Sequence, residues 1–170
     1  MQSPRVGGLH LQFGADASTE VVVSWHSSTP HRNPRVMVGT PDDGLGRMVA
    51  ADTVSYRDAA SGTQVRVHHA RLTGLQPDTD YVYAAFHDGA DPEFGTVHTA
   101  PRGRAALRFT SFGDQSTPTL DALVASAFGR DNRGSPAAGD ITTAVERAAP
   151  LFNLVNGDLC YANLASDRVR

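Results

Sequence analysis

The sequence predicts a mixed fold, in which a β-sandwich at residues 6–101 is followed by the first β-α-β part of an α/β domain at residues 102–170. Short runs with alternating apolar residues predict the sandwich, and turn residues such as Gly, Pro and Asp separate these runs. Beyond the small, polar connection at residues 100–106, the pattern changes to strand, helix and strand. We therefore expect two domains.

The strands expected in the sandwich are short and closely spaced. In residues 19–26 the alternation places Val21, Val23 and Trp25 on one face of a strand, so we expect Trp25 in the core. Further strands are expected at residues 48–58, 64–72, 79–87 and 94–99.

One segment of the expected sandwich resembles the corner of fibronectin type III domains. It reads Leu72-Thr73-Gly74-Leu75-Gln76-Pro77-Asp78-Thr79-Asp80-Tyr81. The resemblance implies that Pro77 sets a turn and that the Tyr81 hydroxyl forms a hydrogen bond with the preceding loop. We therefore expect a fibronectin type III-like sandwich.

The second part of the chain is expected to alternate strands and helices. The expected elements are a strand at residues 107–112, a helix that begins at Thr117 and Pro118, an exposed loop at residues 131–139, a helix at residues 141–149 capped by Asp140, and a strand at residues 151–155. An order of this kind predicts two parallel strands joined by a crossover.

Both expected strands of the second part run into a Gly-Asp pair. Asp114 follows Gly113, and Asp158 follows Gly157. Taken singly, each pair is a common turn sequence. Ligands, however, gather at the carboxyl ends of parallel strands, and glycine lets the chain turn sharply there. Two facing carboxylates suit a pair of hard metal ions that activate water against a phosphate ester.

The sequences around these aspartates carry a resemblance. Gly113-Asp114-Gln115-Ser116 and Gly157-Asp158-Leu159-Cys160-Tyr161 resemble the first two of five metal-binding motifs of the purple acid phosphatases. These enzymes are a branch of the calcineurin-like metallophosphoesterases, and the tyrosine after the second aspartate distinguishes the branch. Residues 6–14 and 21–25 are similar to the amino-terminal sandwich domain of the same family. Ser116 stands where the family usually has glycine.

The resemblance implies a dinuclear metal centre that hydrolyses phosphate monoesters. Asp114 would be a terminal ligand of ferric iron, Asp158 would bridge it to a divalent iron, zinc or manganese ion, and Tyr161 would bind the iron as a phenolate. The sequence assigns no catalytic or substrate-binding side chain beyond these metal ligands. Because the family is usually exported, we expect a secreted or cell-envelope location, although no signal peptide is visible in the chain.

The later motifs of the family are absent from these 170 residues. Those motifs are an Asn-His pair, a lone histidine and a His-x-His, whereas no histidine follows Thr99 here. The seven histidines are His10, His26, His31, His68, His69, His87 and His98. Two aspartates and a tyrosine are too few ligands for two ions. We therefore interpret the chain as an amino-terminal fragment that is inactive alone.

Two alternative functions remain open from the sequence. The chain could act as a non-catalytic, fibronectin-like binding module, or belong to a phosphodiesterase or nucleotidase of the same superfamily. His68 and His69 do not add a metal site, because adjacent strand residues point to opposite faces. Asn156, directly before Gly157, is read as a residue that braces the turn.

The composition narrows the range of partners. The net charge is −3, from 18 acidic and 15 basic residues, and no basic cluster suggests a nucleic-acid partner. No apolar run is long enough to predict a membrane span, and the oligomeric state is not indicated. The single cysteine, Cys160, cannot close an internal disulfide and is expected to be a small buried apolar group.

Overall fold

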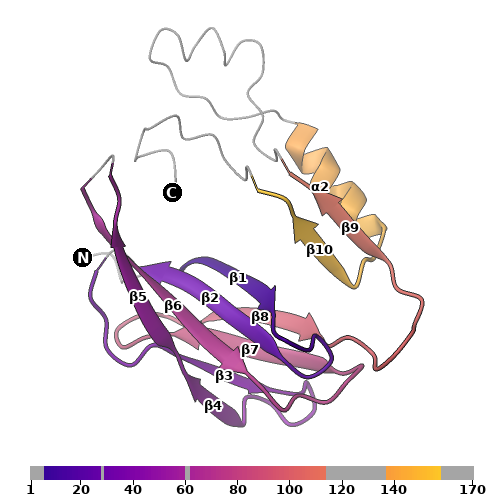
Figure 1. Ribbon diagram of the computed structural model, residues 1–170, viewed down its shortest axis with the longest axis horizontal. Coiled ribbons are helices and arrows are strands. Elements are labelled where there is room, and N and C mark those ends of the chain that lie inside the picture. Colours follow the sequence, from indigo (N-terminus) through magenta and orange to yellow (C-terminus); the bar gives the residue numbers. More distant parts are fainter. Residues whose placement is uncertain (1–5, 28, 60–61, 114–136, 158–170) are drawn as a thin grey trace, which may run out of the picture. The chain divides into compact units, whose positions relative to one another are not determined.

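The structure is a computed structural model that describes residues 6–27, 29–59, 62–113 and 137–157 (Figure 1). The chain divides into two compact units, Met1–Ala105 and Ala106–Arg170. The predicted ligands Asp114, Asp158 and Tyr161 lie outside the described residues, as do Cys160 and the helix expected from Thr117.

The first unit contains two four-stranded antiparallel sheets (Figure 1). The first sheet has the order β1-β2-β6-β5, with bounds Gly7–Phe13, Val21–Ser27, Gln64–Leu72 and Asp52–Arg57. The second has the order β4-β3-β7-β8, with bounds Arg47–Ala50, Arg35–Gly39, Asp80–Phe86 and Glu93–His98. Neighbouring strands within each sheet are antiparallel.

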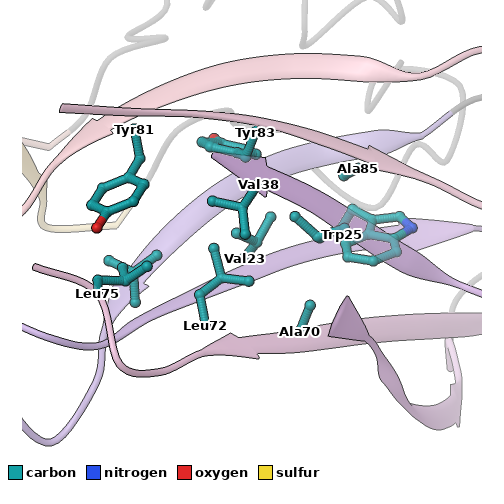
Figure 2. Packing of buried hydrophobic residues seen from close by; sticks show 11 residues of the cluster. Val23, Trp25, Val38, Ala70, Leu72, Leu75, Tyr81, Tyr83 and Ala85 are labelled. Carbon is teal, nitrogen blue, oxygen red and sulfur yellow. The ribbon is translucent and has the colours of Figure 1, made fainter. Parts of the chain in front are cut away.

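The core of the first unit lies between these two sheets. Strand β2 contributes Val21, Val23 and Trp25, as predicted, and all three are at most 2% exposed. They pack in one cluster with residues of the second sheet, including Val38 and Tyr83 (Figure 2). Alternate residues of a strand share one face, so burying them between two sheets produces a sandwich. The predicted β-sandwich is therefore confirmed.

The tyrosine corner forms as the sequence predicts. The backbone N–H of Gln76 donates a hydrogen bond of 2.8 Å to the Tyr81 hydroxyl oxygen. The same loop is attached to the body of the sandwich, because the N–H of Leu75 donates to the carbonyl of Thr19 at 3.0 Å. Figure 2 shows Tyr81 and Leu75 at one end of the core and Trp25 at the other.

We expect Tyr81→Phe to lower the free energy of unfolding by about 1–3 kcal/mol, since the Gln76 N–H would lose its acceptor in a partly buried position. Urea denaturation followed by circular dichroism would measure the loss. Tyr56→Phe is the matched control, because Tyr56 is 55% exposed on β5. Equal stability of the two variants would show that the corner hydrogen bond contributes nothing.

The strand predicted at residues 48–58 is wrong as a single element. The structure has β4 in one sheet and β5 in the other, with Ala51 between them. The N–H of Ala51 donates to the carbonyl of Pro34 at 2.8 Å, which holds the chain where it changes sheets. Strand β3 was not predicted at all, although its burial alternates along its length.

His98, at the end of β8, lies between two carboxylates. Its Nδ1 is 2.7 Å from Asp80 and its Nε2 is 3.1 Å from Asp78. The hydrogen bonds to Asp80 and then to Asp78 raise the pKa of His98 above its ordinary value of 6.5. The protonated imidazole can donate to both carboxylates, so the ion pair favours the charged form.

A pH dependence follows for this ion pair. Because the folded-state pKa is raised, the stabilisation is fully present below the unfolded pKa and is lost as pH rises through the folded pKa. We therefore expect His98→Gln to destabilise the chain more at pH 6 than at pH 8.5. Urea unfolding of parent and variant at both pH values tests this. A larger difference at pH 8.5 would contradict the assignment.

The second unit contains β9 at Phe109–Phe112, α2 at Ala137–Arg147 and β10 at Phe152–Val155. The two strands pair in parallel, with Phe109 opposite Phe152 and Phe112 opposite Val155. The rings of Phe109 and Phe152 stack with their centroids 5.4 Å apart.

The bounds predicted for the helix before β10 are wrong. Residues 137–139 are helical rather than part of a loop, and Asp140 lies in the first turn instead of capping the helix. Alanine favours the helix strongly enough to extend it in the amino-terminal direction, and the Asp140 charge suits that end of the macrodipole. The helix ends at Arg147, before Ala149 takes a φ of 44°.

Candidate functional site

The carboxyl ends of β9 and β10 are held together by hydrogen bonds from Asn156. Its backbone N–H donates to the carbonyl of Phe112 at 3.0 Å, which continues the parallel pairing by one residue. Its side-chain Nδ2 donates to Ser111 Oγ at 2.8 Å. The end of each strand is therefore tied to the other by both the main chain and a side chain.

The two glycines of the Gly-Asp pairs lie next to each other at this edge. A Cβ atom added to Gly113 would lie 3.2 Å from the carbonyl oxygen of Gly157 and 3.5 Å from that of Asn156. Gly157 has a φ of 90°, a conformation that residues with a side chain rarely adopt. Glycine at these positions allows the two backbones to approach closely.

The register explains which residues meet. Strand β9 pairs in register with β10, and β10 has one more residue before its glycine than β9 does. Asn156 therefore lies opposite Gly113, and Gly157 comes one position later. The sequence prediction identified Asn156 as a brace but missed its partner Ser111, because a partner can only be assigned once the register is known.

Further hydrogen bonds join the amino-terminal parts of these two strands to each other and to the end of α2. Thr110 Oγ1 donates to Asn153 Oδ1 across the pair at 2.9 Å. The N–H of Leu151 donates to the carbonyl of Arg108 at 2.8 Å, and the Arg108 guanidinium donates to the carbonyl of Ala148 at the end of α2, also at 2.8 Å. These bonds attach β10 and the end of α2 to β9.

The described residues include no group of three or more His, Cys, Asp or Glu side chains that could hold a metal ion. Both ring nitrogens of His68 are within hydrogen-bond distance of hydroxyls, those of Ser27 and Thr53. His31 and His87 stack with centroids 3.8 Å apart and an interplanar angle of 14°, so their in-plane lone pairs cannot converge on one ion. The predicted ligands Asp114, Asp158 and Tyr161 stay predictions.

A comparison with protein-family models matches one family over more than half of the chain. The family model described as Purple acid Phosphatase, N-terminal domain matches residues 6–100. A solved purple acid phosphatase, PPD1 from yellow lupin (Lupinus luteus) seeds, is 20% identical with a TM-score of 0.62, over 91% of this chain and 30% of that one. At this identity the likeness concerns the fold.

Two curated proteins of Mycobacterium tuberculosis are much more similar in sequence. Uncharacterized protein MT2654 and Uncharacterized protein Rv2577 are each 68% identical to this chain over 168 residues. The alignment covers 99% of this chain and 32% of each relative, so the chain spans about a third of their length. No helix in the described part of the chain is both long and apolar enough to cross a membrane.

Proposed function

The chain belongs to the purple acid phosphatase family, a family of hydrolases, and from this premise we propose that it supplies the sandwich domain and part of the dinuclear metal centre of an acid phosphatase. The substrate class is phosphate monoesters. The observation that carries the proposal is the close approach of Gly113 and Gly157 at the carboxyl ends of two parallel strands, each glycine being followed by aspartate.

The geometry of the described residues fits two carboxylates at one edge. Consecutive Cα atoms are about 3.8 Å apart, so Asp114 and Asp158 each follow one of the two neighbouring glycines by a single Cα–Cα step. Two carboxylates and the phenolate of Tyr161 form a set of hard oxygen donors, which suits iron together with a second divalent ion. In the proposed arrangement Asp114 and Tyr161 would be ligands of the iron, and Asp158 would be a ligand shared by the two ions.

When bound, two such ions supply a water of lowered pKa and positive charge that stabilises the phosphate oxygens. The contribution of this chain is to hold the ligands at a fixed separation. The bonds from Asn156 to Ser111 and to Phe112 hold together the ends of the two strands, after which the aspartates follow in the sequence. Such supporting contacts orient metal ligands and typically change metal affinity or activity by about 10–100-fold when removed.

The polypeptide of 170 residues is expected to have no useful phosphatase activity by itself. Its predicted ligands are two aspartates and one tyrosine, and no histidine follows residue 99. The test is release of a coloured phenol from a generic aryl phosphate, with iron, zinc or manganese added. Turnover well above a control with metal alone would overturn this expectation.

The proposed function itself is tested in a longer protein. In a chimera, this chain replaces the matching third of the Mycobacterium tuberculosis relative to which it is 68% identical. The purified chimera should contain two metal ions and hydrolyse an aryl phosphate monoester faster than the corresponding diester. Faster hydrolysis of the diester would favour a phosphodiesterase, and a chimera without metal or turnover would favour the binding module.

A further inference from the structure

Three histidines close one end of the sandwich core. His68 lies on the inner face of β6, with its ring 5.2 Å from that of Trp25. His87, directly after β7 in the other sheet, has its ring 6.1 Å from His68. His31, from the connection between β2 and β3, stacks on His87 at 3.8 Å. We call His31, His68 and His87 the histidine layer.

The contacts of His68 suit a neutral ring. The Ser27 hydroxyl donates to the carbonyl of Thr29 at 3.2 Å, so it can accept from His68 Nε2 at 3.0 Å. The other nitrogen, Nδ1, is then free to accept from the Thr53 hydroxyl at 2.8 Å. Both nitrogens are satisfied in a single neutral tautomer. His68 is 1% exposed, so water cannot easily supply a replacement partner.

His87 is also 1% exposed, but its nitrogens are in a different situation. Within the described parts of the chain, neither ring nitrogen of His87 has a hydrogen-bond partner, and the same holds for Trp25 Nε1. A charged imidazole in this position would be desolvated without an acceptor for either N–H, which is far more costly than burying the neutral ring.

The titratable and charged groups around the histidine layer are mostly basic. His87 faces His31, His68, Asp88 and Arg35, while His68 faces His31, His69, Arg66 and His26. His31 faces Arg66. Among these described groups Asp88 is the one anion, and its carboxylate is already paired with Arg35 at 2.9 Å and hydrogen-bonded to Asn33 at 2.7 Å.

These surroundings lower the pKa values of all three rings. Burial is the main cause of the lowered pKa of His31, and Arg66 adds to it. Burial, followed by the neighbouring histidines His31 and His69, lowers the pKa of His68. For His87, burial and then His31 and His68 lower the pKa from 6.5 to about 4, against a smaller opposing effect of Asp88.

We propose that the histidine layer is an acid-sensitive switch, which stabilises this end of the sandwich only while its rings are neutral. In its neutral form it holds the connection between β2 and β3 against the end of β7 and so joins the two sheets beside Trp25. Protonation forces like charges onto stacked and buried rings, which opens this end of the core. This acid sensitivity goes beyond the proposed phosphatase function, because it depends on no metal ligand.

The direction of the effect follows from proton linkage. Between the unfolded pKa of 6.5 and the folded pKa of about 4, the unfolded chain binds a proton at His87 that the folded chain does not. Stability therefore falls as pH decreases through this window and is unaffected at neutral pH. Between pH 7.5 and pH 5, His87 alone should raise the unfolding equilibrium constant by about 30-fold.

The test compares urea unfolding of the 170-residue chain at pH 7.5 and pH 5 with that of His87→Phe. Phenylalanine keeps an aromatic ring against His31 but cannot titrate, so the rise in the unfolding constant at pH 5 should be at least about tenfold smaller. Trp25 is the single tryptophan, and its fluorescence follows this part of the core. His10→Phe, at an exposed position, is the control and should keep the full acid effect.

A second measurement decides the matter if His87→Phe does not fold. The ring protons of His68 and His87 in the parent chain can be followed by NMR as the pH is lowered. In the folded protein the chemical shifts of His87 should change little from pH 7.5 to pH 5, and those of His68 should titrate below pH 6.5. A ring that titrates near pH 6.5 with no loss of stability would overturn the proposal, as would an unchanged acid effect in His87→Phe.

Discussion

Replacing Trp25 with alanine is expected to lower the free energy of unfolding by about 3–5 kcal/mol, a large part of the stability of a small domain. Trp25 is fully buried, at 0% exposure, and packs in the cluster that joins the two sheets (Figure 2). Truncation would remove the transfer free energy of the ring and leave a cavity that rigid sheets cannot close.

The measurement is urea unfolding followed by circular dichroism, since the variant has no tryptophan left to report by fluorescence. Phe94→Ala removes a large ring from a position that is 66% exposed on β8, so it should change stability by no more than about 0.5 kcal/mol. If the Trp25→Ala protein were as stable as the Phe94→Ala control, the Trp25 ring would contribute little to the free energy of unfolding.

In the chimera with the Mycobacterium tuberculosis relative, Asp158→Asn is expected to abolish dinuclear metal binding and to reduce phosphate release by more than about 100-fold. In the proposed site the carboxylate shared by the two ions would become a neutral amide, and even supporting residues around metal ligands cost about 10–100-fold when removed. Metal content by elemental analysis and hydrolysis of an aryl phosphate measure the two effects. Asp42→Asn, in an exposed turn of the sandwich, is the matched control.

In the same chimera, Tyr161→Phe tests the role of the tyrosine separately from that of Asp158. In the proposed site the phenolate of Tyr161 on ferric iron would give the protein a visible colour, whereas the charge that activates water would come mainly from the ions. The variant should therefore lose its colour more completely than its activity. An Asp158→Asn protein that keeps both metals and a near-normal rate would show that the second Gly-Asp pair is only a turn, and the proposed function would fail.

The strands that the sequence predicts best are those with one buried face and a clear turn at each end. The prediction at residues 64–72 matches β6 in full, and Tyr81 binds the preceding loop as the corner motif implies. Residues 48–58 were predicted as one strand because their pattern continues without a turn signal. The change of sheet at Ala51 depends on a long-range bond to Pro34, which local pattern does not contain.

The candidate site could be predicted to a similar extent. The parallel order of the two strands follows from their connection, and the Gly-Asp pairs follow from the sequence itself. The bond between Asn156 and Ser111 depends on a register that shifts the two glycines by one residue relative to each other. Local sequence does not set that register here, because the two strands have four residues each and pair in parallel, with no hairpin turn to fix their alignment.

The change of sheet between β4 and β5 also affects how the sandwich can come apart. Arg47–Ala50 is hydrogen-bonded into one sheet and Asp52–Arg57 into the other, so one short stretch of chain belongs to both. Pulling either sheet away would strain this stretch, which makes partial opening of one sheet unfavourable. Amide hydrogens at the centres of the two sheets should therefore exchange with solvent together, as a single cooperative unit.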